Sequence, residues 1–328
     1  MAKLRPWGKI EVIFDSFGRR GWHCIACASF EERAAAVPTW LSHKAVLERT
    51  TALVLNPPAD AGTIKVCRDE IGKSLHSISA LGPTEACAAE LLGPMSAVIE
   101  IVAALPEGSS VVLDITSMPK RYFMFMVMRL MDSPAVSDLI VTYTRPSRYP
   151  EGVLASDPEP ASSLQGLSRN GDVGIGSTMI VGVGYIQFSL SELMEKARGA
   201  ELKFLMPFPP GSPSARRNWR LLQQMDPNVE TSSEIRRVHS MDTFEAYDWI
   251  REALGRRSPD TVELFPMGPK PHSLAMALAY RSDPEKFQVQ YAQPHTYRPD
   301  YSIGVGSDEQ GRLDAYGYCL RRSGVDYI

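Results

Sequence analysis

Two lysines occupy the same kind of turn, each lying between a strand-like segment and an apolar, helix-like segment. Lys120 ends the turn SMPK after the segment VVLDIT, and Lys270 ends the turn MGPK after TVELFP. A proline is well tolerated at a helix start, and the free backbone N–H groups and dipole of the helix favour an anion there. Because a lysine supplies a flexible positive charge, the two turns predict binding of phosphate or carboxylate. The alternative is a solvated lysine at the start of each helix.

Polar side chains beside the two lysines extend the candidate site. Hydroxyl and carboxylate groups at the end of a strand can hydrogen-bond a ribose or hold a lysine in position, and open parallel sheets bind ligands at their strand ends. The residues with suitable groups at the two turns, lysines included, are Asp114, Thr116, Ser117, Lys120, Lys270, His272 and Ser273.

The strand-like segment after each lysine ends in the pattern YxxPxxY, which reads YTRPSRY at 143–149 and YAQPHTY at 291–297. A tyrosine ring can stack on a base, and an arginine can pair with phosphate. We therefore add four further ligand-binding candidates: Tyr143, Arg145, Tyr291 and Tyr297. The alternative is that the tyrosines are partly buried anchors whose hydroxyl groups are bonded within the protein.

An acidic cluster follows the apolar run at 23–29, where Ser29 is succeeded by Glu31, Glu32 and Arg33. A carboxylate in this place could act as a nucleophile or bind a ribose. The simpler interpretation is a helix start, with Ser29 as the N-cap and Glu32 in the capping-box position. The corresponding turn of the second half, PFPPGSPSARRNW, carries arginines and no carboxylate. That difference favours anion binding over a catalytic role shared by both halves.

Metal and cofactor chemistry have little support in the sequence. It contains no HExxH, no Walker A sequence and no Ser/His/Asp order, and its six histidines lack a metal-ligand spacing, so we predict neither a metal site nor a resident cofactor.

Cys24 and Cys27 match CxxC, which suits a redox pair or half a zinc site. Because both lie inside an apolar run, we favour buried strand cysteines. Five cysteines without a framework spacing indicate a reducing cytoplasm.

Strand and helix patterns alternate along the whole chain. The first half predicts strands at 9–15, 23–29, 51–55, 110–115 and 138–144, and helices starting at Ser29 and covering 94–105 and 121–131. The second half predicts helices at 190–198, 214–224, 243–254 and 273–280, and strands at 202–206, 261–265 and 287–291. This alternation is typical of parallel sheets with right-handed crossovers.

The two halves resemble each other in order. Lys120 and Lys270 lie 150 positions apart, Tyr143 and Tyr291 lie 148 apart, and VGVG at 181–184 has an echo, IGVG, nearer the C-terminus. We predict an α/β protein of two Rossmann-like parallel-sheet units, related by internal duplication and a pseudo-two-fold axis. The expected units are 1–185, with a Pro/Ser/Gly-rich insertion near 146–176, and 186–328. The alternative is that proline and tyrosine recur at strand ends in any α/β protein.

Composition excludes several other classes of protein. The 328 residues are 44% hydrophobic and 22% charged, which is typical of a globular chain and argues against disorder. A net charge of −3 gives no global basic field, so duplex nucleic acid is not favoured as a partner. No apolar run has the length of a signal peptide core or a membrane span, so the expected compartment is the cytoplasm.

The stretch VVLDITSMPKRYFMFMV resembles the strand, D-x-T-x-x-x-K and helix element of CARF-type Rossmann-like domains, which sense cyclic oligonucleotides in CRISPR-linked defence. Those domains usually have Gly-Gly-Thr where this chain has Ser-Met-Pro. They pair across a two-fold axis and bind ligand at the seam. The resemblance implies that Asp114, Thr116 and Lys120 line such a seam, with Lys270 as the counterpart.

These observations predict a sensor-like protein that binds a nucleotide or another phosphorylated ligand. It would act with a separate partner protein, and the resemblance places it in prokaryotic antiviral defence. One alternative is a nucleotide-processing enzyme that uses Asp114 or Glu32 as its carboxylate and Lys120 as an electrostatic clamp. Another is a non-catalytic structural subunit of a larger complex.

Overall fold

The chain forms two compact units. The computed structural model describes residues 5–18, 20–56, 64–150, 155–158, 161–169, 177–184, 200–208, 220, 223, 229, 233–254, 261–300 and 302–328. Unit 1 comprises Met1–Pro150 together with His295–Ile328, and unit 2 comprises Glu151–Pro294. The division therefore differs from the one expected at 185/186, because the C-terminal segment returns to the sheet of the N-terminal unit.

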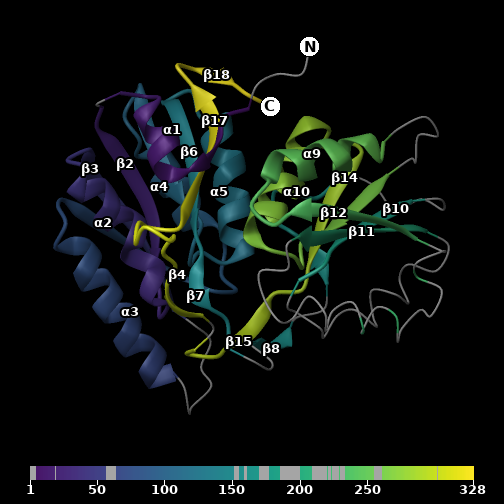
Figure 1. Ribbon diagram of the computed structural model, residues 1–328, viewed down its shortest axis with the longest axis horizontal. Helices are drawn as coiled ribbons and strands as arrows, with labels where there is room; N and C mark the ends of the chain where they lie inside the picture. The colour runs from purple at the N-terminus through teal and green to yellow at the C-terminus, as the bar shows by residue number, and fades with distance from the viewer. Residues whose placement is uncertain are drawn as a thin grey trace. The chain divides into compact units, whose positions relative to one another are not determined.

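Unit 1 is built around an eight-stranded sheet (Figure 1). In spatial order its main path is β1 (Trp7–Lys9), β17 (Ala315–Arg322), β6 (Val136–Thr144), β5 (Ser109–Asp114), β2 (Trp22–Ala28), β3 (Leu47–Asn56) and β4 (Thr84–Glu90), and β18 (Val325–Asp326) pairs with β17. The strands from β6 to β4 in this order are mutually parallel. The returning strand β17 pairs antiparallel with β6, and β1 pairs antiparallel with β17.

Helix α1 (Ile10–Asp15) follows β1. The remaining helices of unit 1 connect its parallel strands: the 3₁₀ helix η1 (Glu32–Ala35), α2 (Ala36–His43), α3 (Ile64–Ser79), α4 (Ser96–Ala103) and α5 (Lys120–Asp132). In Figure 1, α2 and α3 lie on one side of these strands and α5 lies on the other. Apart from its two arginines and Asp132, α5 is buried along its length, as expected for a helix that is apolar on all sides.

Most elements predicted in the first half are confirmed. The strands at 23–29, 51–55, 110–115 and 138–144 correspond to β2, β3, β5 and β6, and the helices at 94–105 and 121–131 correspond to α4 and α5. The strand predicted at 9–15 is wrong, because most of this segment forms α1. Its buried residues Ile10, Ile13 and Phe14 follow helical spacing, so they all face the core together.

The capping box predicted at Ser29 is also wrong. The N-cap of η1 is Glu31, and no side chain caps this helix. Ser29 accepts a hydrogen bond from the Glu31 backbone N–H at 3.3 Å, while the Glu32 carboxylate accepts one from the backbone N–H of Gly304. The Glu32 carboxylate, which the capping-box pattern assigned to the helix start, therefore forms a long-range hydrogen bond with Gly304 instead.

Unit 2 repeats the same kind of sheet. In spatial order its strands are β12 (Glu234–His239), β11 (Glu201–Phe208), β10 (Thr178–Gly182), β13 (Val262–Phe265), β14 (Phe287–Tyr291) and the short β9 (Ser162–Ser163). The first five are parallel, and α9 (Thr243–Glu252) packs against α10 (Lys270–Ser282). The strands and helices predicted over 202–206 and 243–291 are confirmed. The helices predicted at 190–198 and 214–224 lie outside the described residues, apart from residues 220 and 223.

The two units share one strand order, with the first parallel strand in the middle. In unit 1 the second and third parallel strands lie on one side of β2 and the last two on the other, and unit 2 has the same arrangement around β10. The chain is therefore an α/β protein of two Rossmann-like sheets. The VGVG and IGVG echoes do not occupy equivalent places, since 181–184 ends β10 whereas 303–306 contains β16 (Ile303–Val305), which pairs with β7 (Pro146–Arg148).

The stretch near 146–176 was expected as a connector, and its described part contains only short strands: β7, β8 (Ala155–Pro158) and β9. The remaining strand is β15 (Pro294–Tyr297). None of the helices in the described parts of the chain is long and apolar enough to span a membrane.

Candidate functional site

The carboxyl ends of β2 and β5 lie side by side in unit 1. From β2 the chain moves to β3 on one side, and from β5 it moves to β6 on the other, so this is the point where the strand order reverses. Doubly wound sheets bind ligands at such a switch point. The structure thus brings the loop after β2, at 29–33, next to the turn after β5, at 115–120.

Asp114 organises the turn after β5. Its side chain is 1% exposed, and its Oδ1 atom accepts hydrogen bonds from the Thr116 backbone N–H at 3.2 Å, from the Thr116 hydroxyl and from the Thr142 hydroxyl at 3.2 Å. Thr116 in turn accepts from the backbone N–H of Thr144 at 2.9 Å. These bonds tie the turn to the end of β6, so both side chains act as positioning groups.

Ser117 ties the same turn to β2, because its hydroxyl donates to the Cys27 carbonyl at 2.8 Å. Cys27 and Cys24 are buried in β2 as free thiols, which confirms the prediction of buried strand cysteines. Burial, with a smaller contribution from the Asp114 charge, raises the pKa of Cys24 well above its usual range. Such a thiol stays protonated and unreactive.

Lys120 is the first residue of α5 and is only 8% exposed. The preceding Pro119 is the N-cap and provides no side-chain hydrogen bond, and the first turn of the helix contains no acidic residue. Lysine is rarely buried, and a positive charge at a helix N-terminus opposes the helix dipole. Lys120 and the N–H groups of the first turn of α5 therefore stand at the switch point, where the sequence predicts that an anion binds.

Glu31 and Arg33 form a buried ion pair in the loop after β2, with Arg33 only 1% exposed. Arg33 donates to Glu31 from Nε and Nη2, at 3.0 and 2.7 Å, and from Nη1 to the Thr144 carbonyl at 2.7 Å. Burial is the largest single influence and opposes the charge, but the Glu31 carboxylate together with Tyr143 and Tyr149 outweighs it and holds the pKa of Arg33 well above its usual range. Ser302 donates to the same carboxylate, so these residues join the loop to β6 and to the C-terminal segment.

The predicted ligand-binding tyrosines and arginine make contacts within the protein. The buried Tyr143 hydroxyl lies 3.0 Å from that of Tyr149, and Arg145 pairs with Asp314 at 3.2 Å. Tyr297 lies against Phe30 in unit 1, with ring centroids 6.5 Å apart, whereas Tyr291 is buried at the end of β14 in unit 2.

Unit 2 places Lys270 as Lys120 is placed, at the first position of α10 after an N-cap proline. His272 is fully buried with Nε2 3.1 Å from the His239 carbonyl oxygen, and Ser273 donates to the Pro269 carbonyl at 3.3 Å. The switch point of this unit is closely packed, because a Cβ atom on Gly184 would lie 1.9 Å from the Met267 carbonyl oxygen. Gly184 thus lets the backbone after β10 contact the backbone after β13 directly. In unit 1 the turn after β5 contacts β2 through the Ser117 side chain instead.

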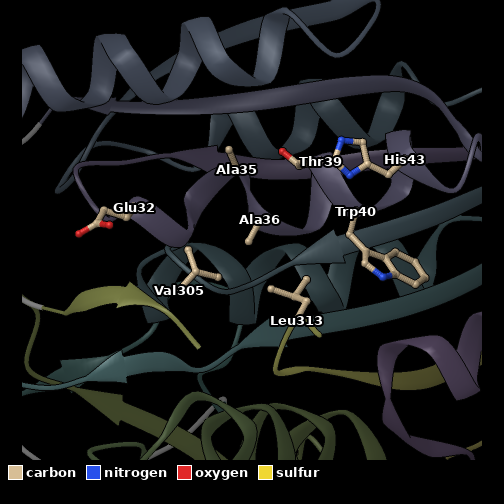
Figure 2. A pocket seen from close by; sticks show the side chains of 8 residues that line it. All are labelled: Glu32, Ala35, Ala36, Thr39, Trp40, His43, Val305 and Leu313. Atoms are coloured by element: carbon tan, nitrogen blue, oxygen red, sulfur yellow. The ribbon is translucent and has the colours of Figure 1, made fainter. Parts of the chain in front are cut away.

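A separate hollow in unit 1 was not predicted from the sequence. It has a volume of about 370 Å³ and is open to solvent. Figure 2 shows the side chains that line it. Residues of η1 and α2 form one side and residues of the C-terminal segment form the other: Glu32, Ala35, Ala36, Thr39, Trp40, His43, Val305 and Leu313. Six of these lining residues lie within the short stretch 32–43, whereas Val305 and Leu313 are more than 260 positions further along the chain. Within the described residues, no group of three or more His, Cys, Asp or Glu side chains is arranged to hold a metal ion.

The fold and site define an α/β protein of two Rossmann-like sheets, with the buried Lys120 at the switch point of unit 1. No protein-family model and no curated protein matches the chain. Among solved structures, it is similar to a "Type III CRISPR defence DNA nuclease activated by cyclic oligoadenylate", with 10% identity, a TM-score of 0.48, and coverage of 87% of this chain and 68% of that one.

Two further solved structures resemble the chain more distantly. The cytoplasmic domain of a prokaryotic cation chloride cotransporter has 8% identity and a TM-score of 0.25, over 84% of this chain and 96% of that one. A putative universal stress protein from Pseudomonas aeruginosa UCBPP-PA14 has 11% identity and a TM-score of 0.25, over 85% and 94%. These values assign the chain to no family.

Proposed function

We propose that the protein binds a phosphorylated ligand, and specifically a nucleotide, at the carboxyl ends of β2 and β5 in unit 1. The observation that carries the proposal is Lys120, a buried lysine at the first position of α5, placed at the switch point of a doubly wound sheet. Its ammonium group and the N–H groups of the first helical turn would bind a phosphate group together.

The neighbouring side chains support this role. Asp114 and Thr116 are buried and hold the turn that carries Lys120, and Ser117 fixes it against β2. The carboxylate of Asp114 accepts hydrogen bonds from protein groups, and the exposed Glu32 accepts one from Gly304. Ligand binding is therefore the function that this geometry supports better than catalysis by either carboxylate.

Lys270 provides a second position of the same kind in unit 2, with His272 and Ser273 close to it along the chain and Tyr291 at the end of the following strand, β14. We propose that it binds an anion at the start of α10. The anion site at each lysine is argued from the geometry of its own unit alone. Substitutions of Lys120 and Lys270 therefore test two separate sites.

The resemblance of the segment around Lys120 to CARF-type domains extends the proposal to a ligand class and a context. A cyclic oligonucleotide would be the ligand, and the protein would act as a sensor in prokaryotic antiviral defence by signalling through a separate partner protein.

Thermal unfolding in the presence of AMP, ATP, cyclic oligoadenylate and inorganic phosphate tests the proposal. A ligand that binds only the folded protein raises its Tm. The Lys120→Ala variant should bind about 10- to 100-fold more weakly, because a hydrogen bond to a charged group is lost. Lys73, an exposed lysine of α3 paired with Glu70, gives the matched control Lys73→Ala, which should bind like the wild type.

A Tm that no compound raises, or a rise that Lys120→Ala leaves unchanged, would overturn the assignment. Lys270→Ala tests the second position in the same way. Chromatography of each nucleotide after incubation with the protein should recover it intact, and release of a product would favour the nucleotide-processing alternative.

A further inference from the structure

The hollow beside α2 has the features of a second ligand site, and it does not include Lys120. Ala35 and Ala36 on one side, with Val305 and Leu313 on the other, provide an apolar lining. Figure 2 shows Glu32 at one end of the hollow and Trp40 and His43 towards the other. Its volume of about 370 Å³ is in the range of small-molecule pockets, which are mostly apolar with a few oriented polar groups.

Contacts within unit 1 hold both walls of the hollow in place. The Gly304 backbone N–H donates to Glu32 Oε1 at 3.3 Å, and Ser302 donates to Glu31 Oε2, so the C-terminal segment is fixed to η1 at two adjacent carboxylates. The Glu31–Arg33 pair anchors η1 to the end of β6. The site is therefore largely formed before a ligand binds, which lowers the entropic cost of binding.

The aromatic end of the hollow is fixed as well. The ring of Trp40 meets that of Phe14 edge to face, with centroids 5.2 Å apart, and the Lys44 ammonium lies 5.5 Å from the indole centroid. Phe14 and Lys44 thus fix the indole ring, which gives this end of the hollow an aromatic surface. Lys44 adds positive charge at this end, whereas the exposed Glu32 carboxylate adds negative charge at the other end.

We propose that this hollow binds a small aromatic molecule that carries an ammonium group. Its ring would lie over the apolar lining towards Trp40, and its ammonium group would pair with the Glu32 carboxylate. Among the described residues that line the hollow, Glu32 is the single carboxylate, so the sign of the ligand charge follows from it. Such a cation is opposite in charge to the phosphorylated ligand proposed at Lys120, so the inference goes beyond that function and does not depend on it.

Three compounds with one ring system test the proposal on the full chain: 2-naphthylmethylamine, 2-naphthylmethanol and 2-naphthoate. Each is titrated while the indole N–H resonance of Trp40 is followed by NMR, with the resonance assigned from the Trp40→Phe variant. The amine should shift this resonance at the lowest concentration and the carboxylate at the highest. Because the ion pair is partly exposed, we expect the amine to bind about two- to fivefold more tightly than the alcohol.

Two variants locate the binding. Glu32→Gln should remove the preference for the amine and leave the binding of the alcohol unchanged. Ala36→Phe should fill the hollow and abolish the shifts caused by all three compounds, whereas Val12→Phe, at a position 66% exposed on α1, should leave them intact. Retained Tm values show that each variant is folded. If the amine has no advantage over the carboxylate, or if folded Ala36→Phe still binds the compounds, the proposal is wrong.

Discussion

His23 is a buried histidine of β2 whose two ring nitrogens both have partners. Arg49 Nε donates to Nδ1 at 3.1 Å, and Nε2 lies 2.7 Å from the Thr51 hydroxyl. Burial, and after it the charge of Arg49, lowers the pKa of His23 to about 4. The folded protein therefore holds the neutral ring, with its proton on Nε2.

This histidine makes the stability of unit 1 depend on pH. In the unfolded chain the His23 side chain has a pKa near 6.5, well above its pKa of about 4 in the folded protein. The contribution of the neutral ring to the free energy of unfolding is therefore fully present above pH 6.5. It should decrease as the pH falls towards 4, by about 3 kcal/mol in total. Urea unfolding at several pH values measures this dependence. His23→Gln should reduce it, whereas the exposed His43 gives the control His43→Gln, which should keep it.

The ion pair of Glu31 and Arg33 leads to a second residue-scale prediction. Arg33→Met leaves the buried Glu31 carboxylate without its main partner, which should cost about 3–5 kcal/mol of stability. The double variant Arg33→Met with Glu31→Gln removes the stranded charge and should recover part of that loss. Urea unfolding of the single and double variants gives the comparison, and equal losses in the two would contradict the role of the buried charge.

At the scale of elements, Arg321 of β17 binds the C-terminal end of α5. It donates to the Met131 carbonyl at 2.5 Å and to the Ser133 and Val136 carbonyls at 3.0 and 3.2 Å, and it pairs with Asp326 at 2.6 Å. The last carbonyl groups of a helix have no partner within it, so an arginine from a distant strand satisfies them. The helix that carries Lys120 is thus fixed at its far end by the returning segment.

Arg321→Lys tests this connection. A lysine keeps the charge but cannot reproduce the planar set of donors, so unit 1 should lose about 2 kcal/mol of stability. Arg129 lies on α5 itself and is exposed, so Arg129→Lys should change the stability little. Urea unfolding measures both variants. Equal losses of stability in the two variants would show that the contact of Arg321 with the end of α5 makes no specific contribution to the free energy of unfolding.

At the scale of the whole molecule, the shared strand order of the two units supports the duplication predicted from the sequence. Lys120 and Lys270 begin corresponding helices, α5 and α10, after corresponding strands, β5 and β13. We propose that both units descend from one ancestral α/β unit. Superposition of the backbones of β2–β6 and β10–β14 tests the proposal, and a poor overlay of these strands would count against it.

The boundaries of the units can be tested with two shortened chains. A chain that joins residues 1–150 to 295–328 through a glycine-serine linker retains all strands of the unit 1 sheet, and we expect it to unfold cooperatively. Residues 1–185 alone lack β17, which would leave β6 as an unpaired edge and remove Arg321 from α5. We expect this fragment to aggregate or to remain unfolded. Circular dichroism and thermal unfolding distinguish the two outcomes, and folding of 1–185 would favour the sequence-based division.

Local sequence was sufficient for the central strands and for the turn that carries Lys120. Alternation of apolar runs, turn residues and helical spacing is a short-range property, so β5, α5 and their counterparts β13 and α10 could be assigned from the chain alone. The same patterns gave the wrong element at 9–15. There β1 spans only three residues, and the apolar positions that follow it at 10, 13 and 14 fit a helix.

Sequence by itself determined that the chain is α/β and that two lysines stand at the starts of helices after strands. Only the tertiary structure placed β17 beside β6, joined Glu31 to Ser302 and formed the hollow between α2 and Leu313. Each of these contacts links residues more than 150 positions apart in the chain. Periodicity shows which face of an element is buried, but the choice of partner depends on packing across the whole unit, which no local pattern encodes.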